Sequence, residues 1–378
     1  MATIAVAQDV KNRTGSSWWV SAVFVATFLP SVAVGLTAGP LIDRLSRKRV
    51  VIGADLARLG VFVALPFATS AAEIVVLAAV VGIGNSFFRP AVLAGVPNLV
   101  ADEDLAHGTA LLQATDWAAA TAGPALGGVL ASASGPHLVY WVNAATFLFS
   151  ALLLLRIPAP LLQSEQAISR GHWRDLGDGL KTFRHSISLR TVLFALGIAQ
   201  LAIGLENASE IFLAEDALHR GPFGFGLFWS ASGLGLVVGS FAVGALLEGR
   251  NEMAVYPLTF LPWAAGVLGA AIAPNIWVGA FAMAVSGFGN GLAFPLSVLI
   301  IQRHTSDLVR GRAFTVIISA HNALLQIGFL SAGGLAAAVG ARFTFGTAAG
   351  LFAASSVIAV VVSRGLRPGG VAVRQQAA

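Results

Sequence analysis

Long apolar runs separated by short polar turns constrain the fold of this chain more than any other feature. About ten of these runs approach the roughly 20 residues that an α-helix needs to cross a bilayer. Across the sequence, 56% of the residues are hydrophobic and only 11% are charged, whereas soluble domains carry about 25% charged residues. A soluble protein of this composition would aggregate. The sequence therefore predicts an all-α integral membrane protein.

The positions of the apolar runs predict two groups of helices. In the first half we expect 18–42, 48–69, 72–97, 106–131 and 136–156, and in the second half 190–213, 222–247, 253–273, 275–301, 312–339 and 342–363. Another apolar stretch, 1–8, is too short to span and lacks the features of a signal peptide. We expect it to be the last part of a further transmembrane helix.

The positive charges predict how these helices are oriented. Short loops rich in Lys and Arg stay on the cytoplasmic side of a membrane. If the loop at 43–49 lies inside, most of the 23 Lys and Arg residues also lie inside, whereas Lys11, Arg13, Arg220 and Arg342 lie outside. The sequence thus predicts a multi-pass protein of a bacterial cytoplasmic (inner) membrane, with its C-terminus in the cytoplasm. Because the cations lie in loops between spans, we expect no nucleic-acid partner.

Two short motifs indicate an internal repeat. The motif at Gly39–Asp43 recurs at Gly244–Glu248, and the motif at Asp104–Ala110 recurs at Asp307–Ala313, both about 204 residues later. Parallel repeats of this kind are a transporter architecture. The repeat predicts an N-terminal bundle at 1–156, a cytoplasmic linker at 157–189, a C-terminal bundle at 190–363 and a cytoplasmic tail at 364–378.

The same period bears on the start of the chain. The counterpart of the span 190–213 would begin before Met1, so most of helix 1 is expected upstream. A misplaced start codon would explain this, and a truncated gene is the alternative.

The loop between the first two complete spans carries a recognisable pattern of one acid and several cations. It resembles the loop between helices 2 and 3 of major facilitator superfamily transporters, with Ser46 where that family has Gly. The resemblance implies the twelve-helix fold of that superfamily. It also implies a cytoplasmic gate between this loop and the start of helix 11, the predicted span 312–339. The alternative is that the cations only determine topology. The residues concerned are Gly39, Asp43, Arg44, Arg47, Lys48 and Arg49, with Arg310, Gly311 and Arg312 before helix 11.

A second motif lies in the predicted helix 106–131, which is helix 5 when the incomplete helix at 1–8 is counted as helix 1. Its residues are Gly123, Pro124, Gly127 and Gly128. It resembles the motif of proton-coupled exporters in this superfamily. Proline removes a backbone donor and kinks a helix, and small residues let another membrane helix approach closely, so a packing kink is the alternative. The segment 87–110 resembles the branch that includes enterobactin and macrolide exporters.

Charged residues inside the bilayer are costly and mark candidate functional sites. Asp55 and Arg58 lie three residues apart on one helix face and can pair, either structurally or as part of proton coupling. Arg89 and Asp116 could pair across two helices, as a fixed bridge or as a proton-responsive one. Each reading stays open from the sequence alone.

Two further acids share one face of the predicted helix 190–213. Glu206 lies deep in the span with no cation nearby in sequence. Burial favours the neutral form of a carboxyl group, so Glu206 could carry a proton or attract a cationic substrate. Glu210 lies nearer the outer surface, where we expect it to be solvated. Trp229 is among the tryptophans expected in an aromatic belt at the outer interface.

The sequence has no phosphate-binding loop, zinc-binding helix motif or nucleophile elbow, so we expect neither an enzyme nor a cofactor. It predicts a monomeric secondary transporter, a proton-coupled exporter of small amphipathic compounds such as drugs, macrolides or siderophores. The alternatives are an importer or facilitator of the same fold, or a non-transporting sensor or truncated pseudotransporter.

Replacing Asp43 tests the predicted gate. Asp43→Asn keeps the size of the side chain but removes the charge that should engage the start of helix 11. We expect transport to fall sharply while insertion persists, because the cations of the loop remain. Cysteine accessibility from the cytoplasmic side should rise. Unchanged transport would reduce Asp43 to a topology residue.

Overall fold

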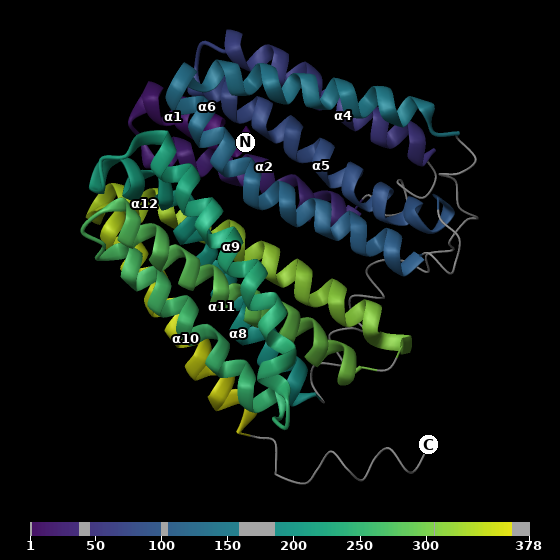
Figure 1. Ribbon diagram of the computed structural model, residues 1–378, viewed down its shortest axis with the longest axis vertical. Coiled ribbons are helices and arrows are strands. Elements are labelled where there is room, and N and C mark those ends of the chain that lie inside the picture. The colour runs from purple at the N-terminus through teal and green to yellow at the C-terminus, as the bar shows by residue number, and fades with distance from the viewer. Residues whose placement is uncertain (1, 38–45, 100–104, 159–185, 306, 365–378) are drawn as a thin grey trace.

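The computed structural model describes residues 2–37, 46–99, 105–158, 186–305 and 307–364. Within these ranges the regular elements are helices (Figure 1). They are α1 (Ala2–Thr14), α2 (Ser17–Thr37), α4 (Arg47–Ala64), η1 (Leu65–Phe67), α5 (Ala71–Leu99), α6 (Leu105–Arg156), α8 (Ile187–Phe212), η4 (Leu213–Ala217), α9 (Gly221–Leu247), α10 (Glu252–Ala271), α11 (Ile276–Arg303) and α12 (Asp307–Ser363).

Eight helices in the described ranges are long and apolar enough to cross a membrane, judged by length and composition. The two longest elements, α6 and α12, each contain a turn at a glycine, Gly135 with φ 74° and Gly340 with φ 82°. Glycine adopts positive φ without the steric penalty of a Cβ atom. Each long element therefore holds two of the predicted spans, 106–131 with 136–156 and 312–339 with 342–363.

The helices pack in two sets. In the first set α1, α2, α4, α5 and α6 contact one another, and in the second α8, α9, α10, α11 and α12 do so. The sets meet where α2 packs on α12 and α6 packs on α9. In Figure 1 they lie together at the left and separate toward the right. We call the end with the turns at Gly15, Gly135 and Gly340 the Gly15 end, and the opposite end, where α4 begins after Ser46, the Ser46 end.

The contacts between the two sets concentrate toward the Gly15 end. Phe24 and Phe28 of α2 stack on Phe329 of α12, with ring centroids 5.2 Å and 5.5 Å apart. The Ser17 hydroxyl donates a hydrogen bond of 2.7 Å to the Gly333 carbonyl. Ser17 begins α2 next to the Gly15 turn, and the stacked rings lie between there and the middle of the helix, so these contacts join the two sets over the half of α2 nearer the Gly15 end.

The close approach of α6 to α9 depends on glycine. A Cβ atom added to Gly226 would lie 2.6 Å from the Pro124 carbonyl oxygen and 3.0 Å from the Gly128 Cα. One added to Gly128 would lie 2.8 Å from the Pro222 carbonyl oxygen. The two backbones are therefore in direct contact, as small residues allow between membrane helices.

The first helix is longer than the sequence predicted. The prediction for this segment ended at residue 8, whereas α1 continues to Thr14. That boundary was wrong because Asp9 and Arg13 are paired inside the fold and do not mark a loop. Tyr140 donates a hydrogen bond of 2.9 Å to Asp9, and Arg13 binds both Asp9 (2.7 Å) and the Ala68 carbonyl (2.8 Å).

Alanine at Gly226 tests the contact between α6 and α9. The added methyl group collides with backbone, which cannot rotate away, so closing the Gly15 end should become less favourable by about 1–3 kcal/mol. Gly244→Ala is the matched control, because it lies on the same helix and its added Cβ meets nothing within 4 Å. Melting of the purified protein in detergent should occur at lower temperature for Gly226→Ala only. Equal melting temperatures for the two variants would contradict the close contact.

Candidate functional site

The second set of helices encloses a cavity of about 200 Å³ between α8, α9, α10 and α11. Glu206 and Glu210 line it together, because residues four apart lie on one face of a helix. The other lining residues are Ile203, Asn207, Trp229, Ser232, Gly233, Leu236, Trp263, Met283 and Asn290. Among these lining residues there is no Lys, Arg or His.

Both carboxyl groups are buried. Glu206 is 5% exposed, and its Oε1 atom lies 3.4 Å from the Ser286 hydroxyl, which donates to it. Glu210 is 2% exposed, and its Oε1 atom has no hydrogen-bond partner among the described residues. Charged groups inside a membrane span are costly unless an opposite charge is near. The cavity can therefore accept a proton or another small cation.

Two expectations for this region were wrong. Glu210 was expected to be solvated, but it is buried, and so are Phe212 and Leu213, which follow it along the chain. Trp229 was expected at the membrane interface. Its side chain lines the cavity instead, and its buried indole nitrogen has no partner in the part of the chain that the structure describes.

Asp55 and Arg58 form a buried ion pair with an N–O distance of 2.5 Å. Arg58 also donates to Asn85 (2.9 Å), and Ser150 donates to the second oxygen of Asp55 (2.7 Å). The guanidinium lies over two rings, 4.3 Å and 4.7 Å from their centroids, which belong to Phe88 and Phe147. Since both charges are well partnered, this geometry favours the structural alternative: removal of either residue would leave an uncompensated buried charge.

A charged contact at the Gly15 end joins the two sets of helices. The Lys11 ammonium of α1 lies 2.7 Å from Glu215 and 2.6 Å from Asp216, both in η4. It also lies 5.0 Å from the centroid of the Phe212 ring, and its side chain is 9% exposed. We call this contact the Lys11 latch. The sequence analysis found only a loop cation here, because nothing local links Lys11 to acids in the other half.

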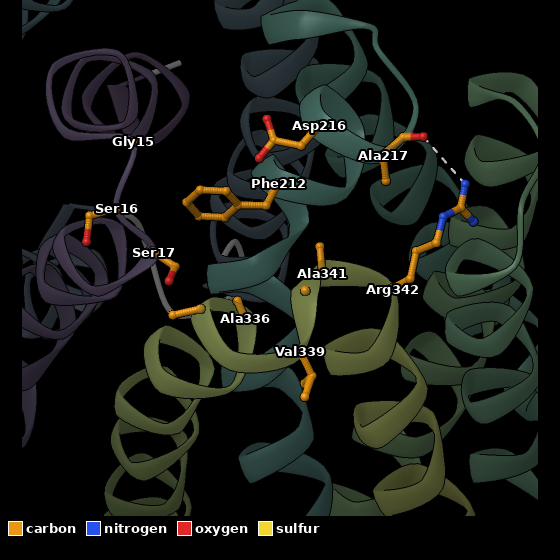
Figure 2. Close-up of a pocket in the computed structure, with 12 residues that line it drawn as sticks. Gly15, Ser16, Ser17, Phe212, Asp216, Ala217, Ala336, Val339, Ala341 and Arg342 are labelled. Carbon is orange, nitrogen blue, oxygen red and sulfur yellow. Dashed lines mark hydrogen bonds between the residues drawn. The ribbon is translucent and has the colours of Figure 1, made fainter.

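A pocket of about 640 Å³ lies beside the Lys11 latch (Figure 2). Gly15 and Ser17 border it from the first set of helices, and Phe212, Asp216 and Arg342 border it from the second. The Arg342 guanidinium donates to the carbonyl oxygens of Ala271 (2.7 Å) and Ala217 (3.5 Å), which ties the turn after Gly340 to its neighbours. The pocket thus marks where the two sets face one another at the Gly15 end.

Several predicted site residues fall outside the described part of the chain. Three of them belong to the loop before α4, and for the others it is the side chains that are not described. The gate and the Arg89–Asp116 pair therefore stay predictions. The residues are Gly39, Asp43 and Arg44, the side chains of Arg47, Arg89, Asp116, Arg310 and Arg312, and the surroundings of Gly311.

The described cations of the same loop motif have separate environments. The Lys48 ammonium donates to the carbonyl oxygens of Leu155 (2.9 Å) and Ile157 (2.6 Å), at the end of α6. A cation in this position stabilises the partial negative charge of a helix C-terminus. Arg49 is exposed and forms no ion pair with any described residue.

The helix 5 motif lies in α6 beside the first turns of α9. Pro124, Gly127 and Gly128 are buried, and Gly128 is the residue that approaches Gly226. The structure thus gives the motif a packing role at the Gly15 end. Its association with export stays a prediction.

This geometry can be compared with known proteins. A profile of the transmembrane secretion effector family matches residues 1–368. The chain belongs to this family of major facilitator transporters. Transporters are not enzymes, so the family agrees with the expected class of protein.

Relatives and a solved structure extend this result. The multidrug efflux pump Tap of Mycobacterium tuberculosis is 28% identical over 351 residues, covering 89% of this chain and 83% of that protein. The enterobactin exporter EntS of Citrobacter koseri is 28% identical over 325 residues, covering 82% and 74%. The crystal structure of the nucleoside transporter NupG superimposes with a TM-score of 0.75 at 13% identity, covering 97% of this chain and 95% of that one. The predicted major facilitator fold is thereby confirmed.

Replacement of Lys11 tests the Lys11 latch. Lys11→Met keeps the length of the side chain but removes the ammonium group that pairs with Glu215 and Asp216. Hydrogen bonds to charged groups contribute about 1.5–3 kcal/mol, so opening of the Gly15 end should become roughly tenfold more frequent. The natural chain has no cysteine, so labelling of a single Ser21→Cys, buried at 1% exposure, reports this opening.

Arg13→Met is the control for this experiment, because Arg13 is a cation of the same helix that binds only within its own set. Labelling should accelerate for Lys11→Met and change little for Arg13→Met. Equal rates in Lys11→Met and the parent protein would show that the contact does not hold this end closed.

Proposed function

We propose that this protein is a proton-coupled exporter of small amphipathic compounds. Residues 1–156 and 190–363 would move as two bundles, joined by the linker 157–189 and followed by the tail 364–378. The Ser46 end would face the cytoplasm, since it carries most of the loop cations. Transport would proceed by alternating access, without a cofactor and in a monomer.

The observation that carries this proposal is the cavity shared by Glu206 and Glu210. Burying two acids in a membrane without a neighbouring cation costs free energy unless a mobile cation binds to them. The cavity of about 200 Å³ is smaller than the 300–1,000 Å³ of typical small-molecule sites. Its size therefore favours a proton or a small ion over the exported compound.

The contacts at the Gly15 end support the alternating part of the cycle. The Lys11 latch, the aromatic stack on Phe329 and the contact of Gly128 with Gly226 all join the two sets at one end. Opening that end requires these contacts to break together. Closing the Ser46 end would then form the predicted gate between Asp43 and the residues before helix 11, Arg310 and Arg312.

The direction of transport rests on relatives and on the helix 5 motif. Two relatives are named for efflux and export, and the motif at Gly123–Gly128 resembles that of proton-coupled exporters. Drugs, macrolides and siderophore-like compounds are the proposed substrates. An importer or facilitator of the same fold is the alternative. Collapse of efflux on addition of a protonophore would separate the exporter from a facilitator.

Glutamine at Glu206 tests the coupling site. A proton carrier must change its charge during the cycle, so Glu206→Gln should abolish proton-driven accumulation in inverted vesicles. Counterflow exchange between equal pools should survive, since it needs alternating access but no net proton movement. Glu73→Gln is the control, because Glu73 is an exposed acid that hydrogen-bonds Thr69 at the start of α5.

Asp116→Asn tests the other candidate site for proton coupling in the same assay. If Glu206→Gln pumps normally and Asp116→Asn does not, coupling belongs to the region of Arg89 and Asp116. If both pump normally, a facilitator becomes the better account of the protein. Loss of counterflow in Glu206→Gln would instead indicate a structural role for this acid.

A further inference from the structure

A groove runs between α4 and α5 near the Ser46 end. It has a volume of about 490 Å³, and its walls are apolar, formed mainly by Val50, Ala57, Val80, Ile83 and Phe87. One charged residue lines it, Arg49, in the first turn of α4. The two helices lie side by side in the first set (Figure 1).

The exposed face of α4 indicates what surrounds this groove. Arg49, Gly53, Leu56, Gly60 and Val63 are all exposed, and their spacing of three and four residues places them on one stripe. Apart from its first residue the stripe is uncharged, and Leu56 is 50% exposed. An apolar stripe on a membrane-spanning helix faces acyl chains. Arg49 therefore stands at one end of a lipid-facing surface, close to the depth of a phosphate group.

The side chain of Arg49 is exposed, at the start of α4. Among the described residues it has no carboxylate partner, whereas its neighbour Lys48 is bound to the carbonyl oxygens at the end of α6. A guanidinium matches the geometry of a phosphate, to which it can donate two parallel hydrogen bonds. The exposed Arg49 guanidinium and the apolar groove beside it are complementary to the phosphate and the acyl chain of one lipid molecule.

We propose that the groove between α4 and α5 binds an anionic phospholipid. One acyl chain would lie between Val50, Ile83 and Phe87, and the phosphate would bind Arg49. The acyl chain alone gives little preference, because the surrounding bilayer offers the same apolar contacts. Selectivity comes from the charge, and one basic residue near a membrane surface favours an anionic lipid roughly fivefold.

Gly53 gives the groove its depth at the middle of the stripe. A Cβ atom added there would meet nothing within 4 Å, so a larger side chain can enter the groove without a collision. Gly60 is a matched position two turns further along the same stripe. It is also exposed and also meets nothing within 4 Å, but it does not line the groove.

Native mass spectrometry of the full chain in detergent measures the headgroup preference. Phosphatidylglycerol and phosphatidylcholine with identical acyl chains are titrated, and phosphatidylglycerol should bind roughly fivefold more tightly. Arg49→Gln should remove this preference. The control is Arg250→Gln, an exposed cation after α9 in the other set of helices, which should leave it unchanged. If Arg49→Gln and Arg250→Gln have the same effect, the proposed phosphate contact is wrong.

The second pair of variants tests the groove itself. Gly53→Leu should weaken the binding of both lipids several-fold, because it occupies the space of the acyl chain, whereas Gly60→Leu should not. Equal binding in these two variants would overturn the proposed location. Inorganic phosphate at millimolar concentration should fail to displace phosphatidylglycerol, since it lacks the acyl chain. Displacement by phosphate would identify a simple anion site and contradict the proposal.

Discussion

Every polar group that this chain carries into the bilayer has to find its partner within the protein, and the described structure is organised around that constraint. The Arg58 guanidinium pairs with a carboxylate, donates to an amide oxygen and lies over two aromatic rings. The Lys11 ammonium pairs with two acids and lies near an aromatic ring, all from the other half of the chain. Glu210 and Trp229 each keep a buried polar atom without a hydrogen-bond partner among the described residues, and both line the cavity in the second set of helices, which is why this cavity calls for a functional explanation.

Backbone contact between the two sets of helices follows from a second, steric requirement. Where Gly128 faces Gly226, the absence of side chains lets α6 and α9 touch. Similar pairs stiffen the second set internally, as where Gly204 of α8 meets Gly328 of α12. Inside one set, such contacts make a rigid body. Between the sets, the described contact of this kind lies toward the Gly15 end, so it can separate without unpacking either bundle.

The sequence predicted the helices well because the bilayer dictates their length and apolar character. It also located the turns near Gly135 and Gly340, where short polar or glycine-containing breaks interrupt the runs. The sequence did not predict which way individual side chains point or which residues they contact in the other half of the chain. The helix α9 is apolar on all sides, so no periodicity showed that Trp229 turns inward. The partner of Lys11 lies in the other half of the repeat, and only folding brings them together.

The Lys11 latch has an electrostatic consequence for the helix that carries the acidic cavity. While it is closed, one ammonium group offsets the two acids of η4, just beyond the end of α8. Once the two sets part, Glu215 and Asp216 lose that counter-charge, only five and six residues beyond Glu210 along the chain. The local potential at this end of α8 then becomes more negative at the moment when water can enter. In the proposed transport cycle, the movement that parts the two sets would therefore also create an attractive field for cations near the acidic cavity.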